Sequence, residues 1–151
     1  MTTLSITQKH DFTAYWLIAL CIIFLDQFTK TLVRMYLSSG ASIGWKNFSI
    51  IHGSNTGVVF GFFQGTNWVF TLIAAIVIIF LCVYWKKLAQ EYTVAWALIL
   101  GGAIGNLIDR ILFGAVTDFI SIGWWPTFNL ADSALVVGVV LLVWKTRSQA
   151  L

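Results

Sequence analysis

Four long apolar runs dominate the sequence. They are 12–25, which continues past Asp26 to residue 33, then 68–85, 92–108 and 119–144. A helix that crosses a bilayer needs about 20 predominantly apolar residues. The first and last runs reach this length only by including a carboxylate, Asp26 and Asp132 respectively. We therefore predict an all-α membrane protein whose single domain, 1–151, holds four transmembrane helices. Their expected ranges are roughly 12–34, 67–86, 91–112 and 129–146.

The connections that follow the first and third predicted helices differ from the apolar runs. In 40–51 and 53–65, Gly, Ser and Asn separate short apolar stretches, which favours short strands. Residues 116–120 resemble a further short extended segment. We expect these connections, roughly 36–66 and 112–128, to form a small β-sheet and loops at the membrane surface.

Basic residues near the ends of the apolar runs predict the orientation in the membrane. An even number of spans places both termini and the 86–91 connection on one side. That side carries Lys9, Lys86, Lys87, Lys145 and Arg147, whereas the opposite side, with much longer loops, carries Arg34, Lys46 and Arg110. We therefore expect cytoplasmic termini and outward-facing long loops. We also expect the first helix to be retained rather than cleaved, because no small-residue cleavage pattern follows its apolar core.

The composition agrees with a multi-pass membrane protein. Hydrophobic residues make up 59% of the chain and charged residues 10%, against about 25% charged in a soluble domain. The net charge is +3, but the basic residues are scattered beside apolar runs, so we expect no nucleic-acid partner. Cys21 and Cys82 both lie in apolar runs and are interpreted as buried packing residues. No His/Cys cluster has metal-ligand spacing, so we expect neither a metal nor another cofactor.

Carboxylates from three different predicted helices fall at similar depths. With a rise of about 1.5 Å per residue, these groups lie about 20–26 Å from the inner edge of a hydrocarbon core about 30 Å thick. The groups concerned are Asp26, Asn106, Asp109 and Asp132. Ionisable groups at such depth generally face the interior of the bundle and mark a functional site. The agreement between independent segments therefore predicts a polar site in the outer third of the membrane.

Two of these groups also have structural interpretations within single helices. Asp26 and Lys30 are spaced i, i+4 and can pair along the first helix, a role as well supported as that of positioning a catalytic group. Asp109 and Arg110 end the third helix. For them we favour a structural network over direct chemistry.

The start of the last helix is open to two interpretations. Asn129 can cap this helix, with Asp132 three residues later in a box-like arrangement. A carboxylate there is also favoured in its ionised form by the helix N-terminus. Asp118, in the short extended segment, resembles a loop residue when it is considered alone.

Two carboxylates that are brought together can share one proton, because two like charges a few ångströms apart cannot both ionise. The ionised partner then activates a water molecule, while the protonated partner polarises a carbonyl group. Such a pair hydrolyses a peptide bond without a metal or a covalent intermediate. The motifs of serine hydrolases and of zinc proteases are absent from the sequence.

Five blocks of the sequence resemble those of the lipoprotein signal peptidases, or type II signal peptidases. The blocks are Asp26-Gln-Phe-Thr-Lys30, Asn55-Thr-Gly-Val-Val-Phe-Gly61, Gly101-Gly-Ala-Ile-Gly-Asn-Leu-Ile-Asp-Arg110, Gly114-Ala-Val-Thr-Asp-Phe-Ile120 and Phe128-Asn-Leu-Ala-Asp-Ser133. They occur in the order that the family has and cover nearly the whole chain from 26 to 133. Residues 58 and 59 are both Val where the family usually has small residues, and we expect a narrower substrate groove.

The resemblance implies a membrane-embedded aspartic endopeptidase with Asp118 and Asp132 as its catalytic dyad. It implies removal of signal peptides from prolipoproteins, just before the lipid-modified Cys of the lipobox. The partners would be diacylglyceryl-modified prolipoproteins and membrane lipids, at the extracytoplasmic face of the plasma (inner) membrane. Positions that match substrate-binding or supporting residues of the family are Asp26, Lys30, Asn55, Gly57, Asn106, Asp109, Arg110 and Asn129.

A small proton- or ion-translocating membrane protein is the competing hypothesis, since carboxylates at one depth also build relays. Asp118 discriminates between the two. A relay favours acidic groups within the spans, whereas Asp118 lies in an outer segment. A structural membrane subunit would leave the carboxylates at one depth unexplained. We favour the protease.

Overall fold

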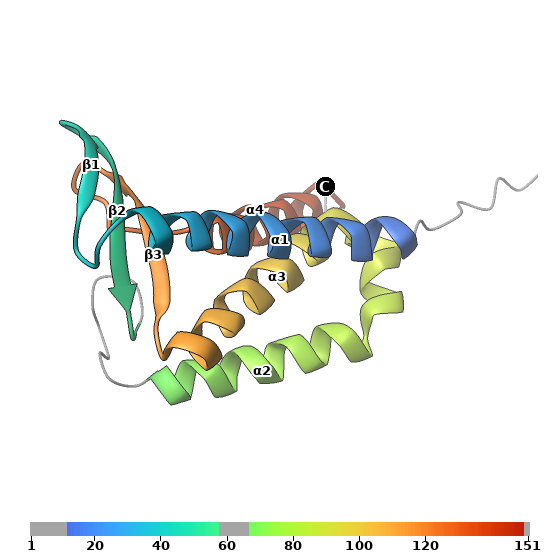
Figure 1. The fold of residues 1–151 in the computed structure, drawn as a ribbon. Coiled ribbons are helices and arrows are strands. Elements are labelled where there is room, and N and C mark those ends of the chain that lie inside the picture. The colour runs from blue at the N-terminus through green and yellow to red at the C-terminus, as the bar shows by residue number, and fades with distance from the viewer. Residues whose placement is uncertain (1–11, 58–66, 150–151) are drawn as a thin grey trace, which may run out of the picture.

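The computed structural model describes residues 12–57 and 67–149, and these form four helices and a three-stranded sheet. The elements are α1 (Phe12–Tyr36), β1 (Ser42–Trp45), β2 (Phe48–Asn55), α2 (Asn67–Val83), α3 (Trp85–Phe113), β3 (Val116–Ile122) and α4 (Leu130–Gln149). The sheet lies at one end of the helices. The start of α1, the α2–α3 junction and the end of α4 lie at the other end (Figure 1).

Two helices in the described part of the chain are long and apolar enough to cross a membrane. They are α1 and the Tyr92–Phe113 part of α3. The apolar helix α2 has 17 residues and α4 has 20. The predicted mostly helical architecture with a small sheet is therefore confirmed, whereas the crossing of the membrane by all four helices stays a prediction.

Helix α3 is the centre of the bundle and packs against α1, α2 and α4. Glycines allow its closest approaches. A Cβ atom on Gly102 would lie 2.5 Å from the carbonyl oxygen of Ala131 in α4, and one on Gly105 would lie 2.6 Å from a carboxylate oxygen of Asp26 in α1. Both distances are too short for a side chain. The absence of side chains there brings the polar residues of three helices into contact.

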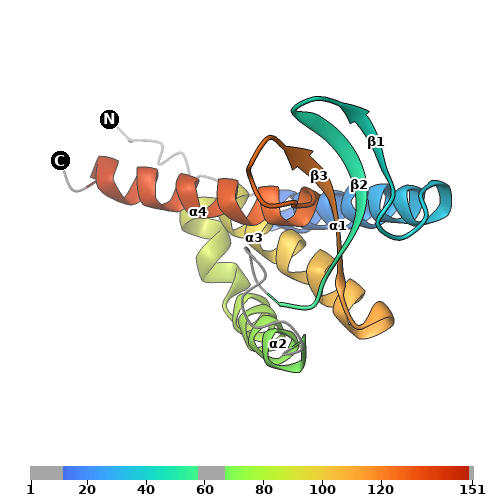
Figure 2. The ribbon, with the colours of Figure 1, turned by 90° about the vertical axis from the view of Figure 1, so that its left-hand side faces the viewer.

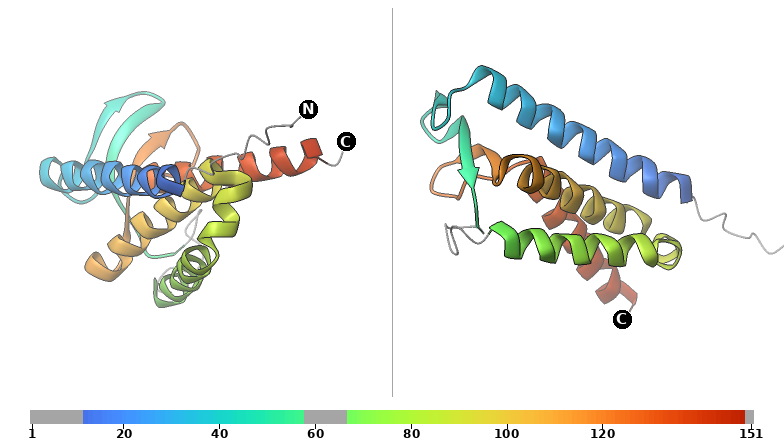
Figure 3. Two further views of the ribbon diagram at one scale, coloured as in Figure 1. Left: turned by 90° about the vertical axis from the view of Figure 1, so that its right-hand side faces the viewer. Right: turned by 60° about the horizontal axis from the view of Figure 1, so that its bottom comes forward.

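The expected connection at 86–91 forms the start of α3. The helix begins at Trp85 and is interrupted at Tyr92, whose φ of −144° and ψ of 60° are not helical. The residues before this break turn away from the rest of α3, as the two views of Figure 3 show. This connection is helical because Lys, Leu, Ala, Gln and Glu, which fill 86–91, all have high helix propensity.

The three strands form an antiparallel sheet in the order β1-β2-β3. Figure 2 shows this sheet in front of α1. Strand β3 contains the extended segment predicted at 116–120. In the β2–β3 pair, Asn55 lies opposite Val116 and Gly53 lies opposite Asp118, after an irregularity between Ile50 and Gly53. The pairing places the end of β2 beside the buried start of β3.

The interpretation of Cys21 and Cys82 as buried residues was wrong, because both are exposed on the surface of the helices. An apolar run in a soluble protein implies contact with a protein core. A membrane-spanning helix can instead be apolar on the side that faces lipid, so an apolar neighbourhood does not locate the cysteine inside the protein. The expected narrowing of the substrate groove at 58 and 59, and the basic residue at position 9, lie outside the described residues.

Candidate active site

Asp118 is held at the buried start of β3 with both carboxylate oxygens occupied. It is 2% exposed. The Asn55 side-chain amide donates to its Oδ2 over 2.9 Å, and the Asn129 side-chain amide donates to its Oδ1 over 2.7 Å. The orientation of Asn55 is set in turn by the Gly57 backbone N–H, which donates to the Asn55 Oδ1 over 2.9 Å. The carboxylate therefore has a fixed orientation at the end of the sheet.

Asp132 lies in the first turn of α4, in the capping arrangement expected from the sequence. Its backbone N–H donates to the Asn129 Oδ1 over 2.8 Å, and its Oδ2 accepts from the Asn129 backbone N–H over 3.2 Å. Its Oδ1 also accepts from the Asn106 side-chain amide over 2.7 Å. The capping role and membership of a polar site were weighed as alternatives, and the structure shows that one side chain does both.

Asn129 connects the two aspartates. Its side chain is fully buried, with its amide nitrogen bonded to Asp118 and its amide oxygen bonded to the backbone of Asp132. A rotation of this amide by 180° would lose both contacts. Asn129 therefore holds the two carboxyl groups in a fixed mutual arrangement.

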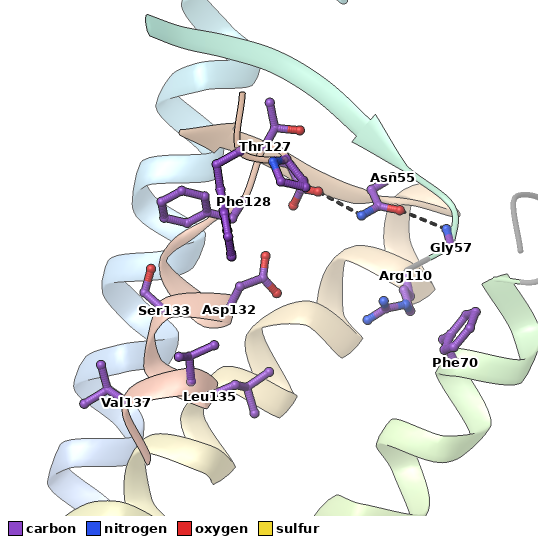
Figure 4. Close-up of a pocket in the computed structure, with 14 residues that line it drawn as sticks. Asn55, Gly57, Phe70, Arg110, Thr127, Phe128, Asp132, Ser133, Leu135 and Val137 are labelled. Carbon is purple, nitrogen blue, oxygen red and sulfur yellow. Dashed lines mark hydrogen bonds between the residues drawn. The ribbon is translucent and has the colours of Figure 1, made fainter. Parts of the chain in front are cut away.

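Both aspartates line one cavity of about 500 Å³ between the sheet and the helices (Figure 4). Arg110 from α3 and Phe70 from α2 lie across the cavity from Asp132. Val136 and Val137 form part of the α4 wall and are 63% and 49% exposed. The cavity thus joins a polar end at the aspartates to an apolar wall that reaches the outer surface of the helices.

The environment of Asp118 favours its protonated form. Burial, and after it the charge of Asp132, raise the pKa of this carboxyl from 3.8 to about 6. The hydrogen bonds from Asn55 and Asn129 and the charge of Lys30 act against these two effects. A carboxyl with this pKa exchanges its proton near neutral pH, as acid–base groups in active sites do.

A buried charged cluster lies behind the aspartates. The Lys30 Nζ lies 2.8 Å from the Asp26 Oδ2 and 3.6 Å from the Asp109 Oδ2, and it donates to the Asn106 Oδ1 over 3.0 Å. The predicted i, i+4 pair of Asp26 and Lys30 is confirmed. The structure also brings together the polar groups that were expected at one depth, because Asn106 links this cluster to Asp132.

The expected network between Asp109 and Arg110 is not formed. Asp109 instead contacts Arg34, whose Nη1 lies 3.3 Å from its Oδ1, and accepts from the Thr117 backbone N–H over 2.8 Å. Arg110 lines the cavity, and its Nε has no hydrogen-bond partner in the described part of the protein. Neighbouring residues on a helix do not face one another, so adjacent positions in the sequence were a poor guide to contact.

Arg34 and Thr117 are supporting residues that the sequence analysis missed. The Arg34 Nη1 donates to the Thr117 Oγ1 over 2.9 Å, and its guanidinium lies 4.3 Å from the centre of the Phe113 ring. These contacts join α1, α3 and β3. A signal was present in the sequence, because Arg34 continues the i, i+4 series that begins at Asp26 and Lys30 on an otherwise apolar helix.

Comparison with known proteins gives consistent results for sequence and structure. The family model described as signal peptidase (SPase) II matches residues 18–147. A lipoprotein signal peptidase of Halothermothrix orenii is 41% identical over 132 residues, covering 85% of this chain and 91% of the relative. That of Halalkalibacterium halodurans is 44% identical over 140 residues, covering 87% and 90%. A bacterial membrane enzyme solved by the in meso method has a TM-score of 0.83 and 33% identity, covering 90% of this chain and 88% of that one.

Proposed function

This chain belongs to the signal peptidase II family, and on that premise we propose that it is a membrane-embedded aspartic endopeptidase that removes signal peptides from prolipoproteins. The observation that carries the catalytic type is the placement of two aspartates. Asp118 and Asp132 come from a strand and a helix, line one cavity and are connected by the buried Asn129. An ion relay has no comparable support, since Asp118 lies in β3 rather than in a helix.

The chemistry that we propose needs one shared proton and one water molecule. The ionised carboxylate takes a proton from water, whose oxygen attacks the scissile carbonyl carbon. The protonated carboxyl gives its proton to the carbonyl oxygen, which produces a gem-diol. The first carboxyl then passes its proton to the leaving nitrogen, the C–N bond breaks, and a gem-diol hydroxyl returns a proton to the second carboxyl. One water is consumed, and the dyad ends in its starting protonation state.

The shape of the cavity supports a substrate that carries lipid. The α4 wall is apolar and exposed at Val136 and Val137, so acyl chains in the membrane can reach it. At the polar end, the Arg110 guanidinium lines the cavity together with the aspartates, and its N–H donors suit a peptide carbonyl oxygen. We propose a diacylglyceryl-modified prolipoprotein as the substrate, cut before its lipid-modified Cys.

We propose that all four helices cross the plasma (inner) membrane, with cytoplasmic termini and the sheet on the extracytoplasmic side. At about 1.5 Å per residue, α2 and α4 are about 26 and 30 Å long, close to a hydrocarbon core of about 30 Å. Four basic residues at the end of the helices away from the sheet support this orientation, whereas Arg34, Lys46 and Arg110 lie toward the sheet, beside much longer connections. The four residues are Lys86, Lys87, Lys145 and Arg147.

The direct test is cleavage by the purified protein in detergent micelles. Incubation with a diacylglyceryl-modified prolipoprotein should release the signal peptide, which mass spectrometry detects together with the position of the cut. The same prolipoprotein without its lipid serves as the control and should be cut far more slowly. Failure to cut the lipid-modified substrate, by protein shown to be folded, would refute the proposed function.

A further inference from the structure

Lys30 fixes the direction of a hydrogen-bond chain that ends on Asp132. An ammonium group can only donate, so the atom that Asn106 presents to the Lys30 Nζ over 3.0 Å is its amide oxygen. The Asn129 side-chain amide donates to the same oxygen over 3.2 Å. The Asn106 amide nitrogen consequently faces the Asp132 Oδ1, over 2.7 Å.

This direction matters for the charge state of Asp132. A donor that faces a carboxylate favours the ionised form, whereas an acceptor in the same place disfavours it. Without the Lys30 ammonium group, a 180° rotation of the Asn106 amide would lose the contact with Asn129 and the contact with an ionised Asp132, whereas a protonated Asp132 could donate to the rotated amide oxygen. The Asn106 oxygen would then face the Asp132 carboxylate, so the charge on Lys30 selects the orientation that suits an ionised Asp132.

The remaining charged groups treat the two aspartates differently. The Arg110 guanidinium, on the α3 side of the cavity, lies across from Asp132. Asp132 also lies at the N-terminus of α4, where the helix dipole favours a negative charge. Asp118 lies in β3, where its burial and the charge of Asp132 oppose its ionisation, and the charge of Lys30 opposes these effects more weakly. In the buried cluster next to Asn106, Lys30 pairs with Asp26 and Asp109, and Arg34 pairs with Asp109.

We propose that Lys30 is a positioning residue that, through Asn106, keeps Asp132 as the ionised, water-activating partner and leaves the shared proton on Asp118. The assignment rests on the proposed peptidase function. It makes Asp132 the group that receives the proton of water, and Asp118 the group that protonates the carbonyl oxygen. Lys30 itself does not contact the reacting atoms, because Asn106 lies between it and the dyad.

The test compares Lys30→Met with Arg34→Met as a matched control. Both changes remove a cation that contacts Asp109, but only Lys30 contacts Asn106. The measurement is kcat/KM against pH, per folded molecule, with a diacylglyceryl-modified prolipoprotein in micelles. Lys30→Met should move the acidic limb of the profile upward by about one pH unit, because an ionised Asp132 has lost its supporting donor and a nearby positive charge. Arg34→Met should leave this limb in place.

Two further measurements separate positioning from folding. In Lys30→Met, the loss of activity at neutral pH should appear as a lower kcat. KM should stay within about twofold of that of the original protein, since substrate binding does not use the hydrogen-bond chain from Lys30 to Asp132. If Lys30→Met does not fold, Asp26→Asn/Lys30→Met removes one charge of each sign and should show the same displaced limb. A limb that stays in place in the folded Lys30 variant, or that moves equally in Arg34→Met, overturns the proposal. Failure of the original protein to cut the substrate overturns the peptidase function instead.

Discussion

Replacing Asp118 with Asn should change the pH dependence of stability in a direction that the structure determines. The folded protein holds the Asp118 proton more tightly than the unfolded chain does, with a pKa of about 6 against 3.8. The original protein therefore loses stability as the pH rises from about 4 to about 6, and the loss is complete above that window. At about 1.4 kcal/mol per pKa unit, two units amount to about 3 kcal/mol at neutral pH. An Asn at this position removes that pH-dependent loss.

An opposing effect comes from the hydrogen bonds. Asp118 accepts from two amide nitrogens, of Asn55 and Asn129, whereas an Asn side chain offers one oxygen. The Asn129 amide cannot rotate without losing its hydrogen bond from the Asp132 backbone N–H. In Asp118→Asn, the hydrogen bond from Asn55 is therefore the one that is lost. An unsatisfied buried donor costs about 1–3 kcal/mol at any pH. Asp118→Asn should therefore be destabilising at pH 4.5 and near neutral, within about 2 kcal/mol, at pH 7.5.

Thermal unfolding in micelles, followed by tryptophan fluorescence at several pH values, measures this difference. The Tm of Asp118→Asn minus that of the original protein should rise as the pH rises from 4.5 to 7.5. Ser121→Ala, on the same strand, is the control and should give an offset that does not vary with pH. An Asp118→Asn offset that is flat or that falls with pH would refute the account of Asp118 as a buried carboxyl held against its neighbour's charge.

Three further predictions address the site and the topology. Replacing either Asp118 or Asp132 with Asn should lower the rate of signal-peptide release by about 10²–10⁴-fold. The double variant should be scarcely less active than either single variant, because the effects of residues that act as a unit are not additive. Substantial cleavage by a folded single variant would contradict the dyad. Arg110→Ala should lower kcat/KM, because its guanidinium lines the cavity together with the aspartates; an unchanged kcat/KM with a lowered Tm would assign it a structural role instead. With Cys21 and Cys82 replaced by Ala, Ser39→Cys should react with a membrane-impermeant thiol reagent in intact cells and Gln149→Cys should not, and the reverse pattern would invert the orientation.

The sequence predicted the helices well where an apolar run was long and the polar exceptions were few. Asp26 and Lys30 stand out in α1 because a charged residue in such a run has no reason to be there without a partner. The same logic did not extend to α3. There the polar residues Asn106, Asp109 and Arg110 end the helix together, and only helical geometry in three dimensions separates Asp109, toward Arg34, from Arg110, toward the cavity.

Other features depended on contacts that no spacing encodes. The capping pattern of Asn129 and Asp132 was visible in the sequence, but its use as a connection to Asp118 depends on where β3 passes α4. Thr117 has no sequence signal of its own, since its backbone N–H serves Asp109 only after β3 has docked on α1 and α3. Local pattern thus predicted the elements, whereas their mutual packing determined the partners.

The ion pair within α1 has a consequence for the biogenesis of the protein. Lys30 has its closest anionic partner, Asp26, in its own helix, whereas Asn106 and the Ala131 backbone N–H that also serve this pair arrive later from α3 and α4. Asn106 follows Lys30 by 76 residues and Ala131 follows Asp26 by 105 residues, so α1 is synthesised before those groups exist. Because the charges of Asp26 and Lys30 compensate one another over 2.8 Å, this pair can enter the lipid bilayer without a net charge, and the remaining charge of α1, Arg34, lies in its last turn. When α3 and α4 pack against α1, the same Asp26–Lys30 pair gains its contacts with Asn106 and the Ala131 backbone and becomes part of the site.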